Sequence, residues 1–91
     1  MTVSDVVIRR ILDNNGLKAI VSVTLDHEIV IHDVRVMSKG DRMYLLYPNH
    51  RHKDKERGMV YPINRFAQEK LEQAVIARYI DAKQKLDEKR N

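Results

Sequence analysis

The chain has 91 residues, of which 43% are hydrophobic and 33% are charged, and its formal net charge is +4. This length and composition are typical of one folded domain with a small core, which excludes a disordered tail. The chain has no cysteine, so disulfides, thiol chemistry and Cys-ligated metals are excluded as well. Because no apolar run is long enough to cross a membrane and the N-terminus lacks a signal-peptide pattern, we expect a cytoplasmic protein.

The first half of the chain predicts an antiparallel sheet. Residues 17–25 alternate between apolar and more polar positions, with Ala19, Val21 and Val23 on one face. In residues 29–37 the same alternation assigns Ile31 to the face opposite Val34. The connections are short polar clusters, whereas a parallel crossover needs about a dozen residues. We expect strands at residues 3–12, 17–25, 29–37 and 42–47, and a short fifth strand at 59–61.

A helical spacing of apolar residues begins after Asn64, which suits the N-cap position. The apolar residues that fall close to one helix face are Leu71, Ala74, Val75, Ala82 and Leu86. We expect one long helix over about residues 64–86, with the mostly charged residues 83–91 frayed. A half-apolar sheet must be covered, and this helix is the only candidate. The single domain 1–91 is therefore predicted to be α+β, an antiparallel sheet of about four or five strands followed by one long C-terminal α-helix.

The positive charge of the chain is concentrated in its second half. Residues 1–50 contain six basic and six acidic side chains, whereas residues 51–91 contain eleven basic and seven acidic ones. A localised basic excess attracts polyanions. The sequence therefore predicts a polyanion-binding surface within residues 51–91.

Four cations alternate along the polar segment after the fourth predicted strand: Arg51, Lys53, Lys55 and Arg57. In an extended loop these side chains would project to one side and could follow the phosphates of a nucleic-acid backbone. Arg65 in the first helical turn can join this surface, and His50 adds positive charge below about pH 6.5. The alternative is a solvated loop whose cations are neutralised by the adjacent Asp54 and Glu56.

The tyrosines and histidines are predicted to be structural residues. We expect Tyr44, Tyr47 and Tyr61 to pack in the core with their hydroxyls at its edge; the alternative is a ring that stacks on an unpaired base. The histidines are not spaced to converge as three or four ligands, so we expect neither a metal nor a cofactor. The chain has no Gly-rich phosphate loop and no GxSxG or HExxH pattern, so we expect no enzymatic activity and no small-molecule substrate.

Several segments of the chain resemble the SpoVG family (stage V sporulation protein G). The segments that carry the resemblance are Val3 to Arg10, Leu25 to Val36, Pro48 to Arg51 and Tyr61 to Asn64. They have the order and spacing of that family from Val3 to about Tyr79. Tyr61 stands where the family usually has histidine, and the mixed charges of residues 83–90 replace its frequent acidic tail.

This resemblance implies an antiparallel sheet followed by an α-helix, dimers formed through strand contacts, and neither enzymatic activity nor a cofactor. Members of the family are small bacterial proteins that bind DNA, and in some cases RNA, as regulators of cell division, sporulation and virulence-related expression. The positive segment after the fourth strand is the part associated with DNA contact.

We therefore expect a homodimeric, nucleic-acid-binding regulator of gene expression in septation or sporulation-type processes, with DNA as its ligand and RNA as a second candidate ligand. The predicted binding residues are Arg51, Lys53, Lys55, Arg57, Arg65 and His50. The alternative function is a protein-interaction module that acts through a sheet edge or the helix face without binding nucleic acid.

Overall fold

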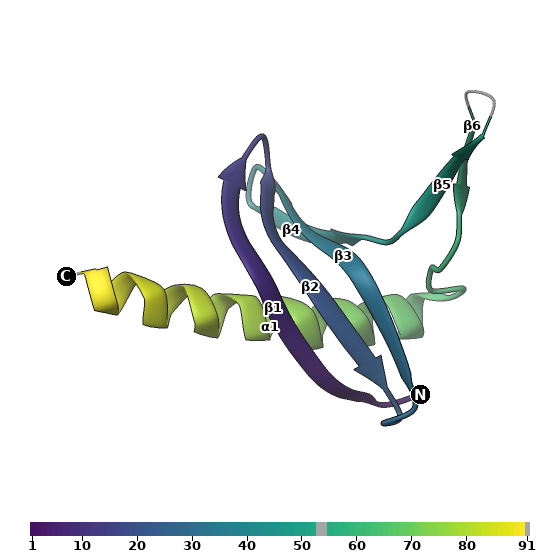
Figure 1. Ribbon diagram of the computed structural model, residues 1–91, viewed down its shortest axis with the longest axis horizontal. Helices are drawn as coiled ribbons and strands as arrows, with labels where there is room; N and C mark the ends of the chain where they lie inside the picture. The colour runs from purple at the N-terminus through teal and green to yellow at the C-terminus, as the bar shows by residue number, and fades with distance from the viewer. Residues whose placement is uncertain (53–54, 91) are drawn as a thin grey trace.

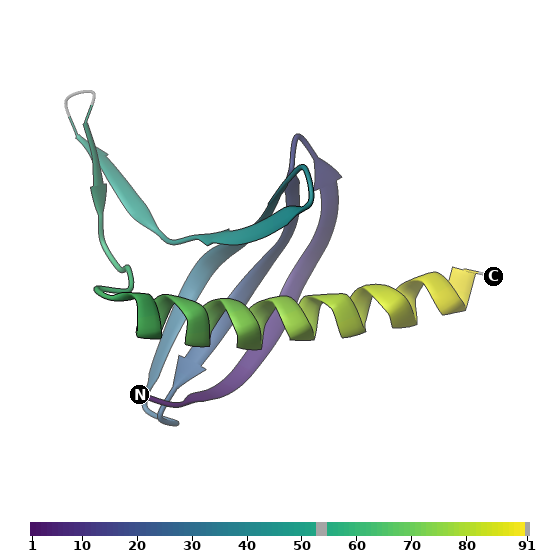
Figure 2. The ribbon, with the colours of Figure 1, turned by 180° about the vertical axis from the view of Figure 1, so that it is seen from behind.

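The computed structural model describes residues 1–52 and 55–90, and of residues 49–52, 55–58 and 90 it describes the backbone alone. The strands are β1 (Val3–Asn14), β2 (Leu17–Leu25), β3 (Ile29–Lys39), β4 (Arg42–Leu46), β5 (Asn49–His52) and β6 (Lys55–Gly58), and the helix is α1 (Arg65–Arg90). The first four strands form one antiparallel sheet in chain order, and β5 and β6 form a separate hairpin. Helix α1 crosses one face of the sheet and leaves the other face open (Figures 1 and 2). The predicted α+β class is confirmed.

The core lies between the sheet and α1. Val21, Val34 and Val36 have no exposed surface, and they belong to one cluster with Val75 and Tyr79 of the helix. Burying a valine side chain stabilises the fold by roughly 1.5–3 kcal/mol, so this layer holds the helix on the sheet. The apolar face predicted for residues 17–25 is confirmed, because the alternate residues Ala19, Val21 and Val23 are all buried.

A β-bulge in β3 changes which of its residues face the core. Val21 pairs with Val34 and Val23 pairs with Ile31, so β3 has one residue more than β2 between these pairs. Asp33 lies at the bulge with a positive φ of 61°, a conformation that Asp tolerates better than most residues. The extra residue brings Ile31 to the same side as Val34, and Ile31 is only 8% exposed. The predicted assignment of Ile31 to the opposite face is therefore wrong.

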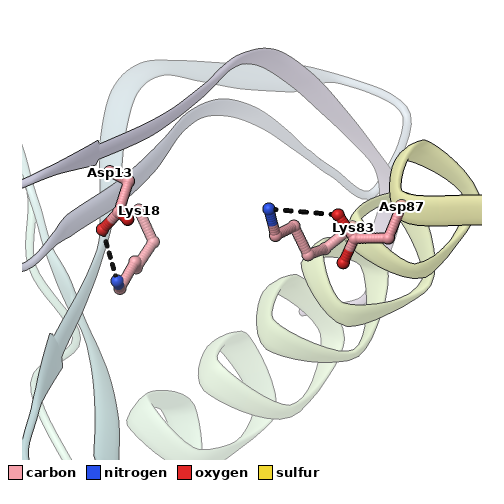
Figure 3. A network of polar contacts seen from close by, with 4 residues as sticks. All are labelled: Asp13, Lys18, Lys83 and Asp87. Atoms are coloured by element: carbon pink, nitrogen blue, oxygen red, sulfur yellow. Dashed lines mark hydrogen bonds and ion pairs between the residues drawn. The ribbon is translucent and has the colours of Figure 1, made fainter. Parts of the chain in front are cut away.

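The helix begins as predicted and ends later. Asn64 is the N-cap, since its Oδ1 accepts a hydrogen bond from the Ala67 amide at 2.8 Å. The helix continues to Arg90, so the predicted fraying from residue 83 is wrong for residues 83–90. Two i,i+4 ion pairs support these turns: Lys83 with Asp87 at 3.4 Å, drawn in Figure 3, and Lys85 with Asp81 at 3.2 Å.

The segment that joins the hairpin to α1 is not a strand. The predicted fifth strand at 59–61 is wrong, because the pairing partners in this region lie within residues 49–58. The Met59 amide donates a hydrogen bond to the Pro48 carbonyl oxygen at 3.2 Å, which closes the base of the hairpin. Residues 59–64 then connect the hairpin to the helix N-terminus.

In the part of the chain that the structure describes, no helix is long and apolar enough to cross a membrane.

Candidate nucleic-acid interface

The predicted basic loop is a β-hairpin that projects away from the sheet (Figures 1 and 2). Strands β5 and β6 pair with each other, and among the described elements they pack against no other strand or helix. The prediction of an extended loop over this segment is therefore wrong. The hairpin keeps the basic segment outside the core, where a large ligand can reach it.

The register of the hairpin rearranges the basic positions. Residue 50 lies opposite residue 57, residue 52 opposite residue 55, and residue 51 opposite residue 56. Because opposite positions of an antiparallel pair share a face, His50, His52, Lys55 and Arg57 occupy one face of the hairpin. Arg51 and Glu56 occupy the other face.

The predicted binding residues that the structure describes therefore fall into three groups. His50, Lys55 and Arg57 share one face of the hairpin, and Arg51 lies on its other face. Lys53 lies outside the described residues. Arg65 is the first residue of α1 and is exposed, separated from the hairpin by the connecting residues 59–64. The single-sided row of four cations predicted from the sequence is not formed.

An exposed apolar patch lies between the hairpin and the helix. We use the name apolar patch for Met59, Val60, Tyr61, Ile63 and Phe66. Ile63 is 84% exposed and Phe66 is 85% exposed, values that are unusual for side chains of this size. Beside it is an apolar cleft of about 170 Å³, lined by patch residues and by residues such as Leu25 and Leu71. The patch is not recognisable in the sequence, because apolar residues at a helix start resemble core residues.

Comparison with known proteins identifies the family. The SpoVG family model matches residues 1–81. This chain belongs to the SpoVG family. Over 80 residues it is 40% identical to a protein named "Putative septation protein SpoVG" from Brevibacillus brevis. It is 39% identical over 80 residues to proteins of the same name from Geobacillus thermodenitrificans and Bacillus cytotoxicus. These alignments cover 87% of this chain and 84%, 83% and 82% of the three relatives.

The tyrosines of this SpoVG-family chain differ in their surroundings. Tyr47 packs against the core as predicted, whereas Tyr61 is 62% exposed, so the prediction of core packing is wrong for Tyr61. The Tyr47 hydroxyl is buried rather than at the edge, and it has no hydrogen-bond partner among the described residues. Burial, and to a lesser extent the nearby charge of Glu72, raises the pKa of Tyr47 to about 12.

Replacing Tyr47 with phenylalanine is expected to stabilise the fold by about 1 kcal/mol, because it removes a buried hydroxyl that lacks a partner. The pKa of Tyr47 is about 12 in the folded state and near 10 when unfolded, so the unfolded state ionises first. The unfolding free energy of the wild type should therefore be unaffected by this ionisation below pH 10 and should fall as the pH rises towards 12. Tyr47→Phe should remove this fall. Urea unfolding at several pH values measures both effects. Tyr44→Phe is the control, and a destabilised Tyr47→Phe would contradict the expectation.

The histidines within the described side chains form no metal site. His32 Nδ1 lies 2.8 Å from Ser22 Oγ, and the Ser22 hydroxyl also accepts a hydrogen bond from Arg9 Nε at 3.0 Å. In this part of the chain, no group of three or more His, Cys, Asp or Glu residues is arranged to hold a metal ion. His32 therefore acts here as a hydrogen-bonding residue on the sheet.

Proposed function

We propose that this chain is a homodimeric, nucleic-acid-binding regulator of the SpoVG family that grips phosphates with the hairpin β5–β6. Its ligands are DNA and RNA, and it acts in the cytoplasm on gene expression in septation and sporulation-type processes. It works by binding rather than by catalysis. The membership of the family and the names of its relatives as septation proteins support the process.

The observation that carries the proposal is the register of the hairpin. The face formed by positions 50, 52, 55 and 57 contains Lys55, Arg57 and two histidines and no acidic residue. Glu56, which in the linear sequence lies between the cations, belongs to the face of Arg51. Neutralisation by Glu56 is therefore weaker than the sequence suggests. A basic strand pair that stands clear of the fold can follow a phosphate backbone without first displacing other contacts.

The apolar patch supports the dimer. An exposed group of large apolar side chains on a small domain typically marks a protein interface. A twofold contact brings the same patch together from two copies, which buries Ile63 and Phe66 of both. Because the patch continues directly from β6 through Met59, such a contact also brings two hairpins into one assembly.

A salt titration of the wild-type protein tests the function. If each hairpin of a dimer engages about two phosphates, the log of the affinity for duplex DNA should fall against log salt with a slope of about −3.6. Gel-shift or anisotropy measurements on DNA and RNA at several salt concentrations measure this slope. If neither nucleic acid is bound at low salt and a partner protein is captured instead, the protein-interaction module replaces this proposal.

A further inference from the structure

The open face of the sheet, on the side away from α1, carries a second basic surface. In one row across the sheet, Arg10 lies opposite Ile20, Ile20 opposite Arg35, and Arg35 opposite Leu46. Their chain neighbours Ala19, Val36 and Leu45 are buried under the helix, so this row points to the opposite side. We use the name open face for the row Arg10, Ile20, Arg35 and Leu46, together with Arg9.

The guanidinium groups of the open face are available to a ligand. The ion pairs among the described side chains involve Lys18 and the helix residues Arg78, Lys83 and Lys85, and none of them includes Arg9, Arg10 or Arg35. Arg9 donates its Nε proton to Ser22 Oγ, and Ser22 is only 3% exposed. This contact orients the guanidinium, and its two terminal nitrogens have no hydrogen bond or ion pair with another described side chain, so they can contact a phosphate.

The acidic residues of the same half of the chain lie mostly elsewhere. Asp13, Asp26, Glu28 and Asp41 lie at the ends of the strands, whereas Asp5 and Asp33 belong to the open side of the sheet. Asp13 is already paired with Lys18 at 2.8 Å (Figure 3), and that partner lowers its pKa. The charges of residues 1–50 therefore cancel in the sequence, whereas on the open face the three arginines outnumber the two carboxylates of Asp5 and Asp33.

Beside Arg35 the open face contains a pocket of about 190 Å³. It is lined by Asp33, Arg35, Leu46, Tyr47 and Pro48. Leu46 and Pro48 supply apolar surface beside one cationic and one carboxylate group. This combination matches an unpaired base, because a carboxylate accepts a hydrogen bond from an exocyclic amino group. Neighbouring strands are about 4.8 Å apart, so Arg10 and Arg35 lie about 10 Å apart and can contact nearby phosphates of one strand.

We propose that the open face binds single-stranded nucleic acid, with its phosphates on Arg9, Arg10 and Arg35 and one amino-bearing base in the pocket at Asp33. This proposal rests on the proposed nucleic-acid-binding function and adds a second surface to the hairpin. The apolar side chains between the cations favour a single strand over a duplex. Unpaired bases can pack on these side chains, whereas the bases of a duplex are already stacked on one another. A second copy of this chain fits the face less well, since a twofold contact would oppose the arginines with one another.

The experiment compares two variants of equal charge in the full chain. One is Arg9→Gln with Arg10→Gln and Arg35→Gln, and the control removes three cations from the helix: Arg78→Gln, Lys85→Gln and Lys89→Gln. Fluorescence anisotropy with labelled oligo-dC of about 20 nucleotides is measured across salt concentrations. We expect the open-face variant to bind roughly tenfold more weakly and to lose about 2 from the salt slope, at about 0.7 for each phosphate contact. We expect little change for the helix control.

Two further variants keep the test decisive. Arg10→Gln with Arg35→Gln leaves the Arg9–Ser22 contact intact, so it reports on binding even if the triple variant unfolds. Asp33→Gly tolerates the positive φ and removes the carboxylate, so it should reduce the preference for oligo-dC over oligo-dT.

The outcomes distinguish this inference from the proposed function. If the wild type binds oligo-dC and the open-face and helix variants weaken equally or not at all, the open face is not the site, while the hairpin proposal stands. If the wild type binds no nucleic acid at low salt, both proposals fail. An unchanged preference in Asp33→Gly would remove the base pocket from the proposal.

Discussion

Replacing Lys55 and Arg57 by glutamine should weaken the binding of duplex DNA at least about tenfold, which corresponds to roughly 1.4 kcal/mol for the dimer as a whole. These two residues are the cations on the hairpin face whose described positions 50, 52, 55 and 57 include no acidic residue. Each phosphate contact that is lost also removes about 0.9 from the salt slope, so a dimer that loses four contacts should bind with almost no salt dependence. Gel-shift titrations at several salt concentrations measure both quantities.

The matched control for the hairpin removes two cations from the helix, as Arg78→Gln with Lys85→Gln. Both cations contact Asp81, at 3.8 and 3.2 Å, so they are partly neutralised and their loss should leave the DNA affinity nearly unchanged. Arg51→Gln is a further comparison, because Arg51 shares its hairpin face with Glu56. Equal weakening of the hairpin variant and the helix control would contradict the hairpin as the duplex-binding element and indicate an effect of net charge alone.

The sheet and the helix were predictable because their signals are periodic and local. Apolar alternation in residues 17–25 and helical spacing after Asn64 each report burial on one side of an element. The side chain of Ile31 was assigned to the wrong face because one inserted residue at Asp33 reverses the alternation beyond it. A bulge of this kind depends on how two strands pair, and the sequence of one strand does not contain that information.

The candidate site was predictable as a segment but not as a surface. The basic composition of residues 51–57 identified the segment, yet it contains no apolar alternation to indicate a strand pair. The register that separates Glu56 from Lys55 and Arg57 exists only in the folded hairpin. The arginines of the open face were missed for a similar reason, since counting charges over residues 1–50 adds acidic residues at the strand ends to cations in the middle of the sheet. Composition gives only the net charge of a segment, whereas a ligand responds to the electrostatic potential of the surface that it contacts.

Replacing Ile63 and Phe66 with glutamate should convert the proposed dimer to a monomer. Both side chains are more than four-fifths exposed, so the substitution removes almost no contact within one protomer and should leave the unfolding free energy nearly unchanged. In a twofold contact, the same change brings four carboxylates into one apolar interface. Like charges that lose their water oppose association, and we expect a dimer at least about 100-fold weaker, or roughly 3 kcal/mol. Sedimentation equilibrium at micromolar concentration measures the mass.

The control for the apolar patch is Ile29→Glu with Val30→Glu, which charges two exposed apolar residues at the start of β3. That variant should keep the dimer mass, because these residues lie outside the patch. A wild-type mass of one chain, or a dimer that survives Ile63→Glu with Phe66→Glu, would contradict the patch as the interface.

If the monomeric variant also binds duplex DNA with about half the wild-type salt slope, the two hairpins act together, since each protomer then contributes its own phosphate contacts. Dimer formation would in that case raise DNA affinity because a second hairpin adds its own phosphate contacts, without any new kind of contact between protein and DNA.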